Sequence, residues 1–312
     1  MSGRRTYVVA CLSGHGIGPE VMAEASRALA RVSRLHGFRV EETHPAFGGE
    51  AVTQSGHALP AATREATRAA DAILVAAARE PALAGVESEL DLHARVDRVA
   101  FAPRGEISVF SPLGESAVEW TVEHAFTAAR SRRAQVCSVG GDNRWNSVLR
   151  AVAARHDGVV VEELPVGAAL QRVALDPERF DVFVTPEPFA EALVGVAVHG
   201  RRPRVVASGR LAGTGPGVFA PAHGAVLEIA GQGVANPASM LLATALLLEG
   251  LGERSAAETL AGAVIEACSH GLQTPDMVTA GVGATTREFA NGVLEKLPAA
   301  LTNAEFYREA FA

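Results

Sequence analysis

The residues best suited to chemistry lie in one glycine-rich passage, residues 217–237. It carries His223, Glu228 and Asn236, which are an imidazole, a carboxylate and a carboxamide. An imidazole ring can stack on a planar base, and a carboxylate can accept hydrogen bonds from both hydroxyls of a ribose. Pro237 then opens a predicted helix, for which Asn236 is the natural N-cap. The passage therefore predicts a nucleotide pocket, and a loop that folds back on itself is the alternative.

A second glycine-rich segment, residues 14–18, lies between a predicted strand, Tyr7–Leu12, and a helix opened by Pro19. Such a turn lets backbone approach a ligand and directs helix N–H groups at it. The spacing does not match G-x-G-x-x-G, so it does not predict a Rossmann dinucleotide fold. A tight structural turn and a binding loop fit this spacing equally well.

Five further side chains are available for acid–base catalysis: Glu187, Glu191, His93, Asp142 and His15. None of them forms a recognisable acid–base pair with another in the sequence. Each is more typical of a surface, capping or packing residue. The catalytic residues therefore stay unassigned at this stage.

The elements that must position these groups alternate between short apolar runs and helical patterns. Predicted strands are Tyr7–Leu12, Ala72–Ala77, Gln135–Val139, Val159–Leu164, Phe180–Thr185 and Arg204–Ser208. Predicted helices are 19–37, Pro60–Ala70, Val118–Arg130, Asn143–Arg155, Gly167–Ala174, Phe189–Val198, Pro237–Leu251, Ala256–His270 and Thr286–Leu297. The alternation predicts an α/β fold with a mostly parallel sheet covered by helices on both faces. Residues 78–116 are the least regular segment and the expected crossing between two lobes.

Composition excludes several classes of protein. The chain has 312 residues, of which 48% are apolar, and a net charge of −7 without a basic stripe, so nucleic-acid binding is not expected. The longest apolar stretch, Met240–Leu248, is too short to span a bilayer, and the first residues do not resemble a signal peptide. Three separated cysteines indicate buried thiols in a reducing compartment. We expect a cytoplasmic protein with no membrane contact.

Several segments together resemble one family. Residues 14–20 resemble the motif GDGIGPEV, 47–60 resemble GGxAxxxxGxPLP, 180–185 resemble FDVIVT, 217–237 resemble FEPVHGSAPDIAGKGIANP, and 271–276 resemble GYRTPDL. These matches occur in order along most of the chain. By this resemblance the chain is identified as a member of the β-decarboxylating dehydrogenases, the family of isopropylmalate and isocitrate dehydrogenases.

The resemblance implies a two-lobed isopropylmalate-dehydrogenase-like fold, distinct from the Rossmann fold. Residues 1–93 and 204–312 would form the first lobe, which carries the nucleotide loop, and 94–203 the second, which mediates dimerisation. The residues implied to bind NAD are Ile17, His223, Gly224, Glu228, Ala235, Asn236 and Asp276. His223 and Asn236 would meet the adenine and Glu228 the ribose hydroxyls. Because a carboxylate repels a 2′-phosphate, NAD is favoured over NADP.

The family's reaction needs a lysine as proton acceptor and a tyrosine as proton donor, and neither has a counterpart here. The lysine motif V-x-K-A-N falls at residues 139–143, with Gly141 in place of the lysine. The single lysine of the chain is Lys296, near the C-terminus. The two tyrosines, Tyr7 and Tyr307, lie near the two ends of the chain.

The metal ligands and the substrate clamp are altered too. The three metal-binding aspartates correspond to Gly167, Glu191 and Gly195, and one carboxylate holds Mg²⁺ poorly, so no metal is expected. Two substrate-binding arginines correspond to Glu87 and Asp97, although Arg95 and Arg98 lie close by in sequence.

Together these features predict a protein that binds NAD or another adenine nucleotide but lacks metal-dependent oxidative decarboxylation. It would be a repurposed enzyme or a non-catalytic subunit. One alternative is an NAD-dependent oxidoreductase that acts on a different small acid at a remodelled, metal-free site, and another is a purely structural or partner-binding protein. The resemblance also implies a homodimer that pairs through the helices Asn143–Arg155 and Phe189–Val198, with a shortened form of the strand arm that clasps two subunits in the family. The second helix has an apolar stripe formed by Phe189, Ala192, Leu193, Val196 and Ala197. A single helix buried inside a monomer would show the same stripe.

Overall fold

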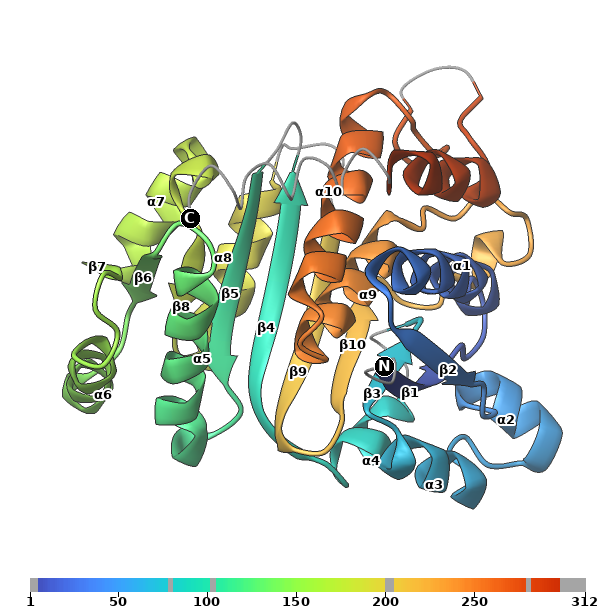
Figure 1. The fold of residues 1–312 in the computed structure, drawn as a ribbon, viewed down its shortest axis with the longest axis horizontal. Helices are drawn as coiled ribbons and strands as arrows, with labels where there is room; N and C mark the ends of the chain where they lie inside the picture. Colours follow the sequence, from blue (N-terminus) through green and yellow to red (C-terminus); the bar gives the residue numbers. More distant parts are fainter. Residues whose placement is uncertain (1–4, 78–80, 102–104, 200–204, 279–281, 298–312) are drawn as a thin grey trace.

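A single ten-stranded sheet organises the computed structural model, which describes residues 5–77, 81–101, 105–199, 205–278 and 282–297. The strand order is β2-β1-β3-β10-β9-β4-β5-β8-β6-β7 (Figure 1). The strands are β1 Thr6–Leu12, β2 Arg39–Thr43, β3 Ala72–Val75, β4 Asp91–Phe101, β5 Gly105–Pro112, β6 Gln135–Val139, β7 Val160–Leu164, β8 Val182–Val184, β9 Val205–Thr214 and β10 Gly217–Pro221. Among the described residues every strand belongs to this sheet, so they include no separate strand arm.

Most of the sheet is parallel, and the antiparallel part is its middle. The strands pair in parallel from β2 to β10 and again from β5 to β7. Between these two parallel parts, three pairs are antiparallel: β10 with β9, β9 with β4, and β4 with β5. These long central strands join the two parallel ends into one continuous sheet.

Helices cover both faces of the sheet. They are α1 Gly18–His36, α2 Gly48–Ser55, α3 Ala61–Ala69, α4 Leu83–Glu87, α5 Val118–Arg130, α6 Asn143–Ala153, α7 Val166–Leu175, α8 Glu187–Val198, α9 Ala238–Gly250 and α10 Arg254–Ser269, followed by a helical segment at 286–297. On one face, α1, α5, α6, α9 and α10 share the largest apolar core. On the other face, one core contains α7 and α8, and a separate core contains α4. On this second face, separate groups of helices therefore cover the two ends of the sheet.

The alternation of strands and helices along the sequence is confirmed, and most boundaries agree within two residues. The prediction that residues 78–116 are the least regular segment is wrong, because β4 and β5 are long, paired strands in the middle of the sheet. Strand β4 was missed because Arg95, Asp97 and Arg98 interrupt its apolar pattern. Arg95 and Asp97 pair with each other, and Arg95 and Arg98 also pair with Glu191 and Glu249, which lie far away in the sequence and which a local pattern does not show.

The lobe boundary predicted at residue 94 falls inside β4, so the chain would pass from one lobe to the other within a strand. Within the described ranges, no helix is both long enough and apolar enough to cross a membrane. All three cysteines are buried and free, as their separation in the sequence predicted.

Candidate functional site

The two glycine-rich segments of the sequence contact each other. The backbone N–H of Ile17 donates to the carbonyl of Ala225 at 2.8 Å. Gly16 lies so close to this carbonyl that a Cβ at position 16 would stand 2.0 Å from its oxygen, and the φ of Gly16 is +65°. Only glycine satisfies both conditions, so the turn at 14–18 has a structural role in positioning the passage at 217–237.

The C-terminal half of the passage is fixed by side chains from two distant helices. Thr286 donates from its backbone N–H to the carbonyl of Gly233 at 2.8 Å and from Oγ1 to the carbonyl of Ala235 at 2.7 Å. From α1, Glu20 Oε2 accepts a hydrogen bond from the N–H of Gly233 at 3.1 Å. The passage is thus held from both sides and does not simply fold back on itself.

His223 has the environment expected of a ligand-binding imidazole. Its Nδ1 lies 3.1 Å from the carbonyl oxygen of Gly224, while its buried Nε2 has no hydrogen-bond partner among the described residues. Burial lowers the pKa of His223, against the opposing influences of Gly224 and the Asp276 carboxylate. At neutral pH the ring is therefore uncharged, with one polar nitrogen left for a ligand.

Asn236 lies beside the same site and is largely occupied. Its Nδ2 donates to Met277 Sδ at 2.7 Å, and its Oδ1 accepts from the N–H of Ala238 at 2.9 Å. Because α9 begins at Ala238, its N-cap is Pro237 and not Asn236 as predicted, but Asn236 still accepts from the first N–H of the helix. Glu228 is exposed on the short 3-10 turn Leu227–Ile229, where a ligand can reach its carboxylate. Their roles toward a nucleotide stay predictions.

Gly141, which the motif comparison predicts to replace the family's lysine, has no room for a side chain. Gly141 has a φ of +102°, and a Cβ there would lie 2.4 Å from Trp145 Cδ1. Trp145 is itself buried, and its Nε1 donates to Ser138 Oγ at 2.9 Å. The glycine is thus required by the local packing, and the missing lysine is not a simple point change.

The remaining lysine and the first tyrosine do not replace the missing catalytic groups. Lys296 Nζ lies 3.2 Å from Glu266 Oε1 on α10, and the Tyr7 hydroxyl donates to Glu253 Oε1 at 2.8 Å. Tyr307 lies outside the described residues. Both described side chains serve contacts within the first lobe.

The residues at the metal positions do not fit a divalent cation. Gly167 and Gly195 offer no ligand atom, and the side chain of Glu191 is 75% exposed with its Oε1 3.4 Å from Arg95 Nη1. Within the described ranges, the one group of three side chains close enough to share an ion is Cys11, Glu42 and His44. In that group Cys11 lies on β1, Glu42 on β2 and His44 just after β2, away from the predicted metal positions, so no reaction step is assigned to a metal.

Five charged side chains from four elements meet where the family's substrate clamp would lie, and we call them the charge network. They are Glu87 at the end of α4, Arg95 and Asp97 on β4, Glu191 on α8 and Arg210 on β9. Arg210 Nε lies 2.9 Å from Glu87 Oε1, and Arg95 Nε lies 2.8 Å from Asp97 Oδ2. Both arginines are therefore neutralised by carboxylates of the protein itself.

Burial controls the acidity of the charge network. It raises the pKa of Asp97 despite the nearby Arg95, and it raises the pKa of Glu87 despite Arg210. With three acids and two arginines, the network has a formal charge of −1 when all are ionised. A substrate with two carboxylates would meet net repulsion here, whereas the clamp of the family attracts it.

The other predicted acid–base candidates are not brought together. Asp142 Oδ1 accepts from the N–H of Trp145 at 2.9 Å and so caps α6. Glu187 is exposed in the first turn of α8, where the helix dipole favours an acid. His15 lies against Gly49, where a Cβ would stand 2.9 Å from its ring. These three residues have local roles.

His93 does have an acidic partner, which the sequence reasoning missed. Its Nε2 lies 2.9 Å from Asp91 Oδ1, and the second oxygen of Asp91 accepts from Thr214 Oγ1 at 3.1 Å. Two residues of a strand that are two positions apart share a face, and this was the available signal. The ring of His93 packs against Trp120 at 5.2 Å, so the pair is turned toward α5.

Comparisons with known proteins identify the family of the chain. A family model for isocitrate/isopropylmalate dehydrogenase matches residues 8–102 and 105–293. The 3-isopropylmalate dehydrogenase of Salinibacter ruber is 31% identical, over 96% of this chain and 98% of the relative. That of Synechococcus sp. (strain CC9605) is 30% identical, over 88% and 94%.

Solved structures agree as well. A β-decarboxylating dehydrogenase from Thermococcus kodakarensis, in its apo form, superposes with a TM-score of 0.81 at 26% identity, covering 96% of this chain and 98% of the other. An isocitrate dehydrogenase from Methylococcus capsulatus gives a TM-score of 0.73 at 23% identity, over 93% and 99%, and shows the shared fold. The fold, the ordered motifs and these matches together establish that the chain belongs to the isocitrate/isopropylmalate dehydrogenase family.

Proposed function

We propose that this chain binds an adenine nucleotide, NAD or ADP, at the passage 217–237 and does not carry out metal-dependent oxidative decarboxylation. The charge network carries this proposal, because it pairs Arg95 and Arg210 with carboxylates of the protein itself. Such a protein is a repurposed enzyme or a non-catalytic subunit. Its relatives include 3-isopropylmalate dehydrogenases, and the motifs predict that it departs from them at the positions of the lysine, the metal ligands and the clamp.

The nucleotide half of the proposal rests on His223 and its neighbours. The free Nε2 of His223 gives a base a hydrogen-bonding partner, and the exposed Glu228 is available to ribose hydroxyls. A bound NAD would supply a hydride acceptor, while the residues of this passage bind and orient its adenosine half. Because Glu228 is an acid, we propose that NADP binds more weakly than NAD.

Calorimetric titration tests the nucleotide site. We expect NAD and ADP to bind, and we expect His223→Ala to weaken both by about tenfold, which corresponds to about 1.4 kcal/mol. Glu228→Ala should reduce the difference in affinity between NAD and NADP. The matched control is Glu163→Ala, an exposed acid on β7, which should change neither affinity. Absence of binding of either nucleotide at millimolar concentration would contradict the proposal.

A melting experiment tests the metal half of the proposal. We expect Mg²⁺ and Mn²⁺ to leave the melting temperature unchanged, because Glu191 is the one carboxylate at the metal positions. A site filled to about a hundred times its Kd would stabilise the fold by about 2.7 kcal/mol, which is easily detected. A metal-dependent rise in melting temperature that is lost in Glu191→Ala would show that Glu191 binds an ion. A rise lost instead in His44→Ala would locate the ion at Cys11, Glu42 and His44.

We also propose a homodimer that pairs through helices of the second lobe. Part of the apolar stripe on α8 packs within the chain itself, because Leu193 and Ala197 are buried in the core beneath the helix. Phe189 and Val196 are half-buried and Ala192 is exposed, which leaves part of the stripe for a partner helix.

Light scattering measures this assembly. We expect twice the mass of the 32.4 kDa chain, and we expect Ala192→Arg to shift the protein toward the monomer. The control is Ala62→Arg, an exposed position on α3 of the first lobe, which should keep the dimer. A wild-type mass of one chain at micromolar concentration would refute the dimer.

A further inference from the structure

A groove between α10 and the middle of the sheet lies apart from the charge network. It consists of two adjoining pockets of about 220 and 230 Å³ that share Arg98, Glu249 and Arg254 in their walls. We call the two together the α10 groove. Val96 and Arg98 line it, whereas Arg95 and Asp97 belong to the charge network. Because successive residues of a strand face opposite sides, the groove and the charge network lie on opposite faces of the sheet.

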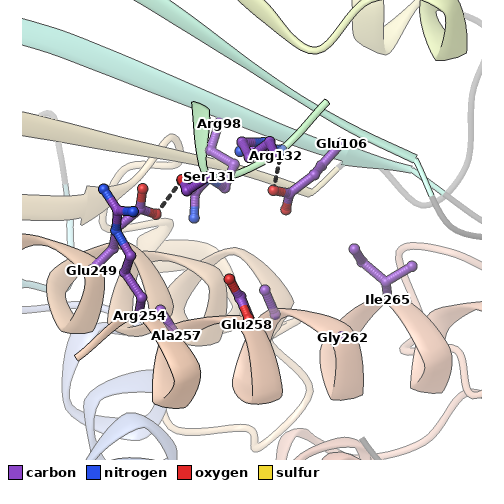
Figure 2. A pocket seen from close by; sticks show the side chains of 11 residues that line it. Arg98, Glu106, Ser131, Arg132, Glu249, Arg254, Ala257, Glu258, Gly262 and Ile265 are labelled. Atoms are coloured by element: carbon purple, nitrogen blue, oxygen red, sulfur yellow. Dashed lines mark hydrogen bonds and ion pairs between the residues drawn. The ribbon is translucent and has the colours of Figure 1, made fainter. Parts of the chain in front are cut away.

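The first pocket is charged and electrically balanced. Three arginines (Arg98, Arg132, Arg254) and three glutamates (Glu106, Glu249, Glu258) line it (Figure 2). Arg98 pairs with Glu249, and Arg132 pairs with Glu106, as the dashed lines in Figure 2 show. A ligand with a single charge would leave this balanced lining with an excess of one sign, whereas a zwitterion matches it.

Arg98 gives an independent sign of a ligand. Its side chain is 4% exposed, yet its buried Nε has no hydrogen-bond partner among the described residues. A buried N–H without an acceptor is costly, so this position favours an oxygen of a bound molecule. Arg254 lies beside Glu249 at the start of α10 and points into the same pocket in Figure 2. A carboxylate placed between the two arginines would accept from both.

The second pocket continues past the Arg98–Glu249 pair and combines apolar walls with polar groups, among them Asp71, His124 and Thr127. Its lining includes Val96, Phe110, Trp120, Leu211, Phe219 and Leu246. Such a pocket accepts an aliphatic or aromatic side chain attached to the charged head group. We propose that the α10 groove binds a small zwitterion with an apolar side chain, of the class of apolar α-amino acids. Its carboxylate lies at Arg98 and Arg254, its ammonium group beside Glu249, and its side chain in the second pocket.

Calorimetry on the full chain tests this assignment with L-phenylalanine as the probe. We expect saturable binding, and at least tenfold weaker binding of L-phenylalanine amide, which lacks the carboxylate, and of 3-phenylpropionate, which lacks the ammonium group. Equal binding of 3-phenylpropionate would overturn the assignment, because it would mean that the groove recognises an anion alone. No saturation by L-phenylalanine, L-leucine or L-valine up to about 10 mM would overturn it as well.

Two exposed positions locate the binding. Arg254→Gln removes a carboxylate donor and should weaken L-phenylalanine binding at least tenfold, and Thr127→Trp should abolish it by filling the second pocket. The matched control is Arg150→Gln, an exposed arginine on α6, which should leave the affinity unchanged. Melting curves check that each variant is folded. Unchanged affinity in both folded groove variants would show that the amino acid binds elsewhere and would overturn the proposal.

Discussion

Replacing Gly141 by lysine is expected to lower the free energy of unfolding by about 2–5 kcal/mol and to produce no detectable hydride transfer. A side chain at this position must adopt a φ of +102°, which L-residues rarely do, and its Cβ would stand 2.4 Å from Trp145 Cδ1. Trp145 cannot easily move, because it is buried and bonded to Ser138. Restoring the family's lysine therefore disrupts the second lobe before it can restore a proton acceptor.

Urea denaturation and NADH absorbance with malate-like acids measure the two effects. The matched control is Gly195→Asp, which restores a family aspartate at a position where a Cβ meets nothing within 4 Å. Aspartate is a slightly better helix former than glycine, so this change should cost little or nothing. A Gly141→Lys variant as stable as the wild type, or one that reduces NAD, would show that the loss of the lysine is reversible.

Replacing Arg132 by alanine is expected to destabilise the fold by about 3–5 kcal/mol, because it leaves the buried Asp181 and the half-buried Glu106 without the guanidinium that pairs with both. Arg132 Nε lies 2.7 Å from Asp181 Oδ1, and Asp181 is 3% exposed. The same guanidinium pairs with Glu106 and donates to Ser108 Oγ at 3.1 Å. One side chain thus satisfies polar groups on β5 and in the segment before β8.

The matched control is Arg130→Ala, an exposed residue at the end of α5, which should change stability by less than about 0.5 kcal/mol. The pH dependence gives a second test. Burial alone would raise the pKa of Glu106, but Arg132 and Arg98 outweigh it and hold this pKa below its usual range. The resulting stabilisation is present above the unfolded pKa of about 4.3 and is lost as the pH falls through the lower folded value. Arg132→Ala should weaken this acid-side loss, and equal stability and pH profiles would contradict the assignment.

The sequence by itself determined the alternation of strands and helices and the family. It also predicted that the family's catalytic lysine and tyrosine and two of its metal-binding aspartates are missing. Short-range patterns suffice for this, since a strand such as β6 or a helix such as α5 has its apolar residues at the spacing of its own geometry. The motif at 217–237 is likewise local, because its glycines, its histidine and the proline that follows act within one loop. The nucleotide-binding residues it implies are still a prediction.

Only the tertiary structure decided what the charged residues of β4 do. From sequence, Glu87 and Asp97 were lost arginines, and Arg95 was a displaced neighbour. In the fold, β4 pairs with β9 and α8 lies nearby, so Glu87 pairs with Arg210 and Arg95 pairs with Glu191. Arg98, one residue further on, faces the opposite side and meets Glu249 of α9. Partners this distant along the chain are chosen by strand register and helix packing, which depend on the whole chain and not on any local pattern.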